Sequence, residues 1–435
     1  MKFKDFPSAV IKENVDYTVK EITNVIKKYG PRESGNDNCF AAEKHLKKEF
    51  DQFTDEAHFE EYEMAPKAFL HFTKTVAVFI IIAVVTGLVL ALTGVISGFF
   101  AAQCIVCAVV GIGLLITVFE FLMYKQFDDF LFPKQTSHNM IATRKPTGEV
   151  KKRIVMVGHS DSQFEWTLNY LIGGLQAKLF VEIPAVVGLV VQTAIAVVGI
   201  IVGATHGGIV AAGKMEVLHP MFIALFVVSC IFIPFELAFL FFQSWTKSVP
   251  GASDNLSGCY VGMAAIKALD EAGIRFENTE VVMICSGSEE AGLRGAKAYA
   301  KAHEKELKEI PTAVVALDTF RDLETMAVYD RDLSGTLKHH KGVKELVHDA
   351  CANCGFDVKY ESIYIGGSDA AAFTQRGIPA TGFAAMDPAP PRYYHTRLDT
   401  PENLRPECIE VGIEIMVEAL CMFDKNGAEG IGDNE

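Results

Sequence analysis

Two adjacent carboxylates, Glu289 and Glu290, follow a short apolar run that is typical of a buried strand. The run covers residues 281–285, and residues 291–302 have the pattern of a helix. In α/β sheets, chemistry is usually placed at the carboxyl end of a strand. Two neighbouring anions there repel each other unless a proton or cations compensate. A solvated helix N-terminus would also favour these residues, because the helix dipole stabilises Glu there.

Other motifs place carboxylates and imidazoles in similar positions. Strand 153–158 leads into His159, strand 312–317 leads into Asp318, and two loops supply Asp254 and His395. With Glu290, these residues form a mixed nitrogen and oxygen donor set that suits zinc. The charges of three carboxylates and two neutral imidazoles nearly balance those of two divalent ions.

The motifs also occur in a recognisable order along the chain. They read His-x-Asp-Ser (159–162), Gly-Ala-x-Asp-Asn-x-Ser-Gly (251–258), Ser-x-Ser-Glu-Glu-x-Gly-x-x-Gly (286–295) and His-Thr-x-x-Asp-Thr (395–400). Gly-Pro-Arg-Glu-Ser-Gly (30–35) and Gly-Gly-Ser-Asp (366–369) accompany them. Together they resemble the two-zinc aminopeptidases of the aminopeptidase Y and bacterial leucyl aminopeptidase type. The resemblance covers most residues outside two long apolar blocks.

The resemblance implies a fold and a metal centre. We expect an α/β fold with a mixed central sheet flanked by helices, and two Zn²⁺ ions per chain. Asp254 would bridge the two metals. His159 and Asp318 would complete one site, and Glu290 with His395 would complete the other.

The resemblance also assigns three catalytic roles. Glu289 would be the general base that takes a proton from water and passes it to the leaving amine. Asp161 would accept the second ring N–H of His159 and so fix its tautomer. Tyr394 would hydrogen-bond the tetrahedral oxyanion. Tyr393 is an equal candidate for that last role.

The expected activity is removal of N-terminal residues from peptides. The resemblance further implies a cis peptide bond between Asp254 and Asn255. One alternative is a single-zinc transferase of the glutaminyl cyclase type, which resembles the same family. Another is a receptor-like or transport-associated membrane protein with a non-catalytic peptidase-like domain. Every ligand position is filled, which favours a peptidase, and metal stoichiometry separates it from a cyclase.

The apolar blocks predict transmembrane helices. Residues 75–119 contain no charged residue, and residues 179–202 and 221–242 are two further apolar runs. A helix needs about 20 apolar residues to cross a bilayer. We therefore predict four transmembrane helices, arranged as two hairpins that are inserted into one peptidase domain. The segments are peptidase domain 1–68, hairpin 69–124, peptidase domain 125–178, hairpin 179–243, peptidase domain 244–425 and an acidic tail at 426–435.

Charge and cysteine content indicate orientation and partners. Five lysines near the spans lie on the catalytic side: Lys67, Lys74, Lys125, Lys178 and Lys247. Only Lys214 lies on the other side, so the positive-inside tendency places the catalytic domain in the cytoplasm. Ten cysteines without disulfide-framework spacing agree with a reducing compartment. The net charge of −14 argues against nucleic acid. The expected partners are a peptide substrate and the lipid bilayer, and the oligomeric state stays open.

Cysteine labelling tests this topology. In a variant whose ten native cysteines are replaced, a cysteine introduced by Lys214→Cys, or within the turn at 93–98, should react with an impermeant reagent in intact cells. One introduced by Gly430→Cys should react only after the membrane is opened. Labelling of the Gly430→Cys protein in sealed cells would reverse the orientation. Recovery of the whole protein in the soluble fraction without detergent would exclude membrane insertion.

Overall fold

The structure is a computed structural model that describes residues 6–92, 96–205, 224 and 227–428. The chain divides into two compact units. The first, here called the sheet unit, comprises Met1–Pro66, Phe132–Glu165 and Trp245–Glu435. The second, the apolar unit, comprises Lys67–Leu131 and Trp166–Ser244.

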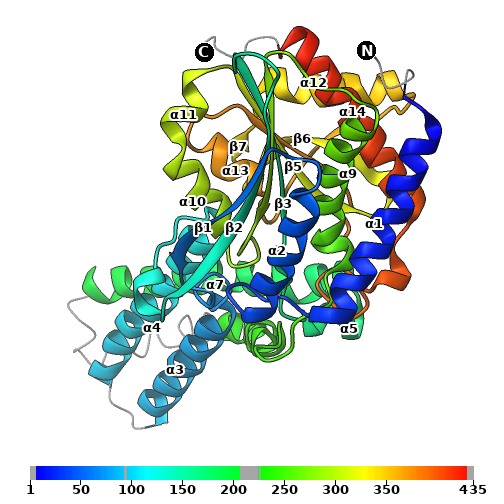
Figure 1. The fold of residues 1–435 in the computed structure, drawn as a ribbon. Helices are drawn as coiled ribbons and strands as arrows, with labels where there is room; N and C mark the ends of the chain where they lie inside the picture. Colours follow the sequence, from blue (N-terminus) through cyan, green and yellow to red (C-terminus); the bar gives the residue numbers. More distant parts are fainter. Residues whose placement is uncertain (1–5, 93–95, 206–223, 225–226, 429–435) are drawn as a thin grey trace. The chain divides into compact units, whose positions relative to one another are not determined.

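A nine-stranded mixed sheet forms the centre of the sheet unit (Figure 1). Its order is β1-β2-β4-β3-β5-β9-β6-β7, and β8 pairs with β6. Strands β4, β3, β5 and β9 run parallel to one another. Antiparallel pairs form between β1 and β2, between β2 and β4, and between β6 and β9. The mixed α/β sheet predicted from the sequence is confirmed. The bounds are β1 (Glu56–Met64), β2 (Gln135–Arg144), β3 (Lys152–His159), β4 (Thr279–Ser286), β5 (Thr312–Phe320), β6 (Met326–Asp332), β7 (Leu337–Lys338), β8 (Lys359–Ser362) and β9 (Ala380–Ala385).

Helices flank this sheet, as Figure 1 shows. Those of one hydrophobic cluster are α1 (Ser8–Tyr29), α2 (Asp37–Phe50), α9 (Gly258–Glu271), α12 (Lys341–Cys354) and α14 (Pro406–Asn426). Those of the other are α10 (Arg294–Ala302), α11 (Glu304–Glu309) and α13 (Asp369–Thr374). Short helical turns lie at η6 (Ala252–Ser257), η7 (Leu323–Thr325) and η8 (Pro401–Asn403).

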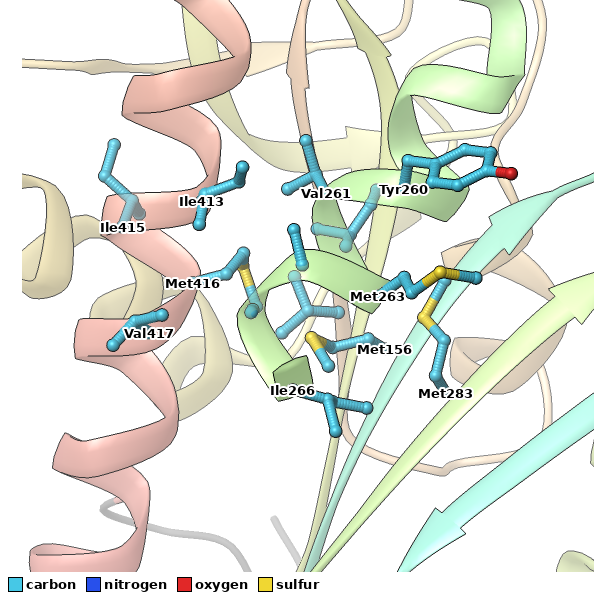
Figure 2. Packing of buried hydrophobic residues seen from close by; sticks show 14 of the residues in the cluster. Met156, Tyr260, Val261, Met263, Ile266, Met283, Ile413, Ile415, Met416 and Val417 are labelled. Atoms are coloured by element: carbon cyan, nitrogen blue, oxygen red, sulfur yellow. The ribbon is translucent and has the colours of Figure 1, made fainter. Parts of the chain in front are cut away.

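Strand β3 shows why the sheet needs helices on both faces. Ile154 and Met156 belong to one hydrophobic cluster, and Val155 and Val157 belong to the other. Successive side chains of a strand point to opposite faces, so an unbroken apolar run must be covered twice. Figure 2 shows the first cluster, in which Met156 lies near side chains of α9 and α14. The two covers fix β3, and with it the position of His159 at its end.

Two glycines allow α9 to approach the sheet closely. A Cβ atom on Gly258 would lie 2.3 Å from the carbonyl oxygen of Leu317 in β5. A Cβ atom on Gly158 in β3 would lie 2.8 Å from the backbone nitrogen of Cys259. Because neither residue has a side chain, the turn before α9 lies directly against the ends of β3 and β5. This contact places Asp254, in the turn before α9, at the carboxyl ends of β3 and β5.

The apolar unit consists mainly of helices that are apolar along their whole length. Cys104–Leu122 and Gly174–Ile201 are long and apolar enough to cross a membrane, and Phe72–Ala83 and Val227–Phe241 are shorter apolar helices. Two spans therefore meet that criterion among the described residues, and the predicted total of four stays a prediction. Residues 93–95 of the predicted turn, and residues 206–223 and 225–226 between and within the two later apolar runs, lie outside the described residues. The elements are α3 (Phe72–Leu92), α4 (Ile96–Ile116), η2 (Thr117–Leu122), η3 (Asp129–Leu131), α5 (Thr167–Ile172), α6 (Gly174–Ala177), η4 (Lys178–Glu182), α7 (Ile183–Thr205) and η5 (Phe239–Phe241).

The unit boundaries differ from the predicted segment boundaries. Residues 67–68, 125–131, 166–178 and 244 belong to the apolar unit, whereas the sequence assigned them to the peptidase domain. The longest of these segments is 166–178. It contains α5 and α6, which expose Leu171 and Leu175. The apolar stretch Gly174–Ile201 thus begins before residue 179, where the sequence placed the start of the second hairpin.

The close approach of α9 to β5 gives a stability prediction. Gly258→Ala should lower the free energy of unfolding by about 1–3 kcal/mol, the range typical of overpacking, because the methyl group meets a backbone carbonyl. Gly262→Ala, on the same helix, is the matched control, since its methyl group meets side-chain atoms of Met283 and Leu317. Helix propensity favours alanine at both positions. Denaturant unfolding in detergent measures both, and equal costs would contradict the close backbone contact.

Candidate active site

The five predicted ligands converge at the carboxyl ends of the parallel strands. His159 ends β3, Glu290 follows β4, and Asp318 lies near the end of β5. Donor atoms of His159, Asp254 and Asp318 lie within 4.8 Å of one another. Those of Asp254, Glu290 and His395 form a second group with the same spacing. Asp254 is the member that both groups share.

The carboxylate of Asp254 faces the two imidazoles with different oxygens. Its Oδ1 lies 3.1 Å from Nε2 of His159, and its Oδ2 lies 3.0 Å from Nε2 of His395. Nε2 of His395 is also 3.3 Å from Oε1 of Glu290. Nε2 of His159 is 3.9 Å from Oδ1 of Asp318. This is the arrangement in which one carboxylate can bridge two cations, each with one imidazole and one further carboxylate.

The charge of this cluster favours bound cations. His159, Asp254, Glu290 and His395 are all buried. Burial raises the pKa of Glu290 to about 7 and, together with the Asp254 charge, raises that of Asp318 to about 6. Burial opposes protonation of His395, but the carboxylates of Glu290 and Asp254 raise its pKa to about 10. These shifts show that the crowded site favours bound positive charge, which protons or metal ions can supply, and the nitrogen and oxygen donors fit zinc.

Glu289 lies outside the two groups that contain Asp254, but its carboxylate forms a third close group with donor atoms of His159 and Glu290. Its Oε2 is 3.9 Å from Nε2 of His159. Burial raises the pKa of Glu289 well above its usual value; His159 opposes this shift and Glu290 adds to it. A carboxylate whose pKa is raised can hold and return a proton more readily than a free carboxylate. Cations at the site would lower that pKa again.

Asp161 contacts His159 and also holds the Glu289-Glu290 turn. The Nδ1 atom of His159 lies 3.2 Å from the backbone oxygen of Asp161 and 3.5 Å from its carboxylate Oδ1. The side-chain contact predicted from the resemblance is therefore the longer of the two. The same carboxylate accepts hydrogen bonds from the backbone N–H groups of Glu289 and Glu290, at 3.1 and 3.2 Å, and from the hydroxyl of Ser34 at 2.6 Å. Asp161 thus fixes the backbone of the carboxylate pair.

The two tyrosines before His395 have different surroundings. The hydroxyl of Tyr393 donates to Oδ2 of Asp322 at 2.7 Å, and its ring lies under the guanidinium of Arg321. The ring of Tyr394 stacks on the imidazole of His395, with 3.7 Å between centroids. This geometry favours Tyr394 over Tyr393 as the residue that reaches the reacting atoms.

Asp399 and Asn255 hold the turn that carries Asp254. No role for either side chain followed from the sequence. Asp399 accepts hydrogen bonds from the backbone N–H groups of Ser253 and Asp254, at 2.8 and 3.0 Å. Asn255 donates to the carbonyl of Leu317 at 2.8 Å and accepts from the N–H of Thr319 at 3.1 Å. The peptide bond between Asp254 and Asn255 is cis, as the resemblance implied. Both residues lie inside recognisable motifs, but nothing in their spacing shows what they contact.

The helix after Glu290 begins later than predicted. Helix α10 starts at Arg294, not at residue 291. Leu293 has φ of 62°, in the left-handed region, and the N–H groups of Gly292 and Leu293 both donate to the carbonyl of Glu289. The carboxylate pair therefore sits in a tight turn, and the interpretation as a solvated helix N-terminus is wrong.

The sequence matches a peptidase family over its second half. Residues 241–420 match the model of peptidase family M28. The matched segment contains Asp254, Glu289, Glu290, Asp318 and His395. No curated protein sequence matches the chain.

Solved structures share the fold at low sequence identity. An aminopeptidase from Aneurinibacillus sp. strain AM-1 matches with a TM-score of 0.51 and 14% identity, covering 97% of this chain and 94% of that chain. A zinc aminopeptidase from Bacillus subtilis matches with a TM-score of 0.51 and 15% identity, covering 94% of each chain. A glutaminyl cyclase from an Acidobacteriales bacterium matches with a TM-score of 0.52 and 12% identity, covering 95% of this chain and 96% of that chain. The zinc aminopeptidase-like fold is thereby shown.

Glu43 on α2, which contacts the residue after His159, predicts how stability depends on pH. Its Oε1 accepts a hydrogen bond from the hydroxyl of Ser160 at 2.8 Å. Burial raises the pKa of Glu43 from 4.5 to about 8. The folded state then holds this proton more tightly than the unfolded state, so the stabilisation is complete below pH 4.5 and is lost as the pH rises to about 8.

Glu43→Gln should remove this dependence, because an amide resembles the protonated acid and does not titrate. Between those pH values, the unfolding free energy of the wild type should fall relative to the variant, by at most about 1.4 kcal/mol per pH unit. Denaturant unfolding of metal-free protein at a series of pH values measures this. Parallel pH profiles for the two proteins would contradict the buried, protonated Glu43.

Proposed function

We propose that the sheet unit is a zinc-dependent aminopeptidase with two Zn²⁺ ions per chain. The observation that carries the proposal is the position of Asp254, whose two carboxylate oxygens face His159 and His395 at 3.1 and 3.0 Å. Asp318 and Glu290 complete the two donor groups. The family M28 match and the aminopeptidase structures support peptide hydrolysis.

Zinc held by His159, Asp254, Asp318, Glu290 and His395 would supply Lewis acidity for the scissile carbonyl and for the attacking water. The protein supplies the proton transfer: Glu289 accepts a proton from the attacking water and delivers it to the leaving amine. Asp161 orients Glu289 by accepting its backbone N–H. Tyr394, stacked on His395, donates its hydroxyl to the oxyanion of the tetrahedral intermediate.

The proposal includes a membrane location. Four apolar helices cross the bilayer as two hairpins, and the sheet unit lies on the cytoplasmic side. The two helical stretches that meet the length and composition criterion support this, as does the excess of lysines on that side. The peptide substrate reaches the active site from the cytoplasm.

A second candidate is a transferase of the glutaminyl cyclase type, because a cyclase structure matches with a TM-score similar to that of the aminopeptidases. Hydrolysis of a panel of aminoacyl fluorogenic substrates, with and without chelator, tests the proposal. The same protein is offered an N-terminal glutaminyl peptide. Chelator-sensitive release of amino acids supports the peptidase, whereas cyclisation without hydrolysis assigns the site to the second candidate. If the zinc-loaded protein converts neither substrate, the domain is non-catalytic.

Metal content tests the bridging role of Asp254. The purified protein should bind two zinc ions per chain, and Asp254→Asn should lose metal because an amide cannot supply the bridging anion. Elemental analysis after dialysis against a fixed free zinc concentration measures both proteins. A single tightly bound ion, unchanged in Asp254→Asn, would be the contrary result.

Turnover tests the role of Glu289. Glu289→Gln keeps the shape of the side chain but cannot accept the proton, so kcat should fall by about 10²–10⁴-fold. Zinc content should stay at the wild-type value, because Glu289 is outside the proposed ligand set. Near-normal kcat in this variant would remove Glu289 from the general-base role.

A further inference from the structure

The two ends of the longer inserted segment pair with each other in the sheet unit. The chain leaves this unit after Glu165 and returns to it at Trp245. Phe164 and Ser248 form an antiparallel bridge. The N–H of Glu165 donates to the carbonyl of Lys247, and the N–H of Val249 donates to the carbonyl of Gln163, both at 2.9 Å. This paired segment, residues 163–165 with 247–249, is here called the insertion base.

The side chain of Gln163 reaches from the insertion base to a predicted ligand. Gln163 is buried, and its Oε1 accepts the N–H of Phe164 at 2.8 Å. That contact orients the amide, so its NH₂ group must point the other way. There it donates to Oε2 of Glu290 at 2.8 Å and to the carbonyl oxygen of Glu290 at 3.2 Å. Oε1 of Glu290 faces His395.

The side chain of Glu165 contacts the loop that carries His395, the other ligand of the same group. It accepts two hydrogen bonds from the guanidinium of Arg397, from Nε to Oε1 and from Nη2 to Oε2, each at 2.5 Å. The backbone N–H of Arg397 donates to the same carboxylate at 3.3 Å. Arg397 is two residues after His395, so this bidentate pair ties the His395 loop to the insertion base.

Both contacts serve one half of the proposed metal centre. Glu290 and His395 belong with Asp254 to one donor group, and His159 and Asp318 belong to the other. Asp318 is instead held within β5, where its Oδ1 accepts the hydroxyl of Thr319 at 2.9 Å. The insertion base is therefore placed to affect one metal position more than the other.

We propose that Gln163 and Glu165 are positioning residues that set the metal affinity of the Glu290–His395 position, and so make that position depend on the insertion base. This inference rests on the proposed two-zinc function. Neither residue is a ligand. Each acts through a neighbour, Gln163 by fixing the carboxylate of Glu290 and Glu165 by fixing the loop of His395.

Zinc titration of the full-length, metal-free protein in detergent tests this proposal. A chromophoric chelator competes for zinc, so that the affinity of each equivalent is measured without reference to activity. Gln163→Leu keeps the side chain close in size but removes the donor. It should weaken one zinc equivalent by about 10–100-fold, the range typical of lost outer hydrogen bonds at metal sites. Glu165→Gln should weaken the same equivalent, and the other equivalent should keep its wild-type affinity in both variants.

Glu280→Gln is the matched control. It breaks the ion pair between Glu280 and Arg153, which is also mostly buried. That pair joins the amino ends of β3 and β4, away from the carboxyl ends that carry the site. Both zinc affinities should match the wild type in this control. Cobalt in place of zinc adds a spectroscopic readout: only one of two d–d spectra should change in Gln163→Leu.

The outcomes separate this inference from the proposed function. Two zinc equivalents in the wild type and unchanged affinities in Gln163→Leu would overturn the inference and leave the two-zinc function intact. Equal weakening of both equivalents would also overturn it, since the effect would then be general. Fewer than two equivalents in the wild type would overturn the proposed centre, and this inference with it.

Discussion

The concentration of carboxylates at the ends of β3, β4 and β5 is the constraint on which the rest of the structure depends. Asp254, Glu290 and Asp318 share a small, largely buried space with two imidazoles. Removing an ion from water costs several kcal/mol unless a partner of opposite charge is present. Protons on Glu289 and Glu290 or bound cations must offset the charge of these carboxylates. The proposed zinc ions would do so through donors that already lie within coordination reach of one another.

Much of the surrounding structure serves to hold these donors in place. The sheet is covered on both faces, and two glycines let α9 lie against β3 and β5. Asp161, Asn255 and Asp399 then fix the turns between strands through backbone hydrogen bonds. These hydrogen bonds hold the carboxylates close together despite their mutual repulsion. The ends of the longer insertion pair directly with each other at Phe164 and Ser248. This pairing explains how the sheet unit accommodates a long insertion.

The sequence was sufficient for what is local. The apolar run before Glu289 predicts β4. The five ligand candidates lie far apart in the chain, and the family resemblance of the motifs, not local pattern, implies that they meet. The sequence was insufficient where one residue or a distant contact decides. Leu293 adopts a left-handed conformation that delays α10, and no periodicity reveals this. Gln163 contacts Glu290 across 127 positions, and Glu165 contacts Arg397 across 232. Neither pair has a sequence pattern, since each depends on how the insertion base folds.

Anomalous diffraction from zinc-loaded crystals of the full-length protein tests the central claim most directly. Data on the two sides of the zinc absorption edge locate each ion without reference to activity. The account predicts two peaks in the sheet unit, one between His159 and Asp318 and one between Glu290 and His395, with Asp254 between them. A single peak, or zinc bound away from Asp254, would contradict it.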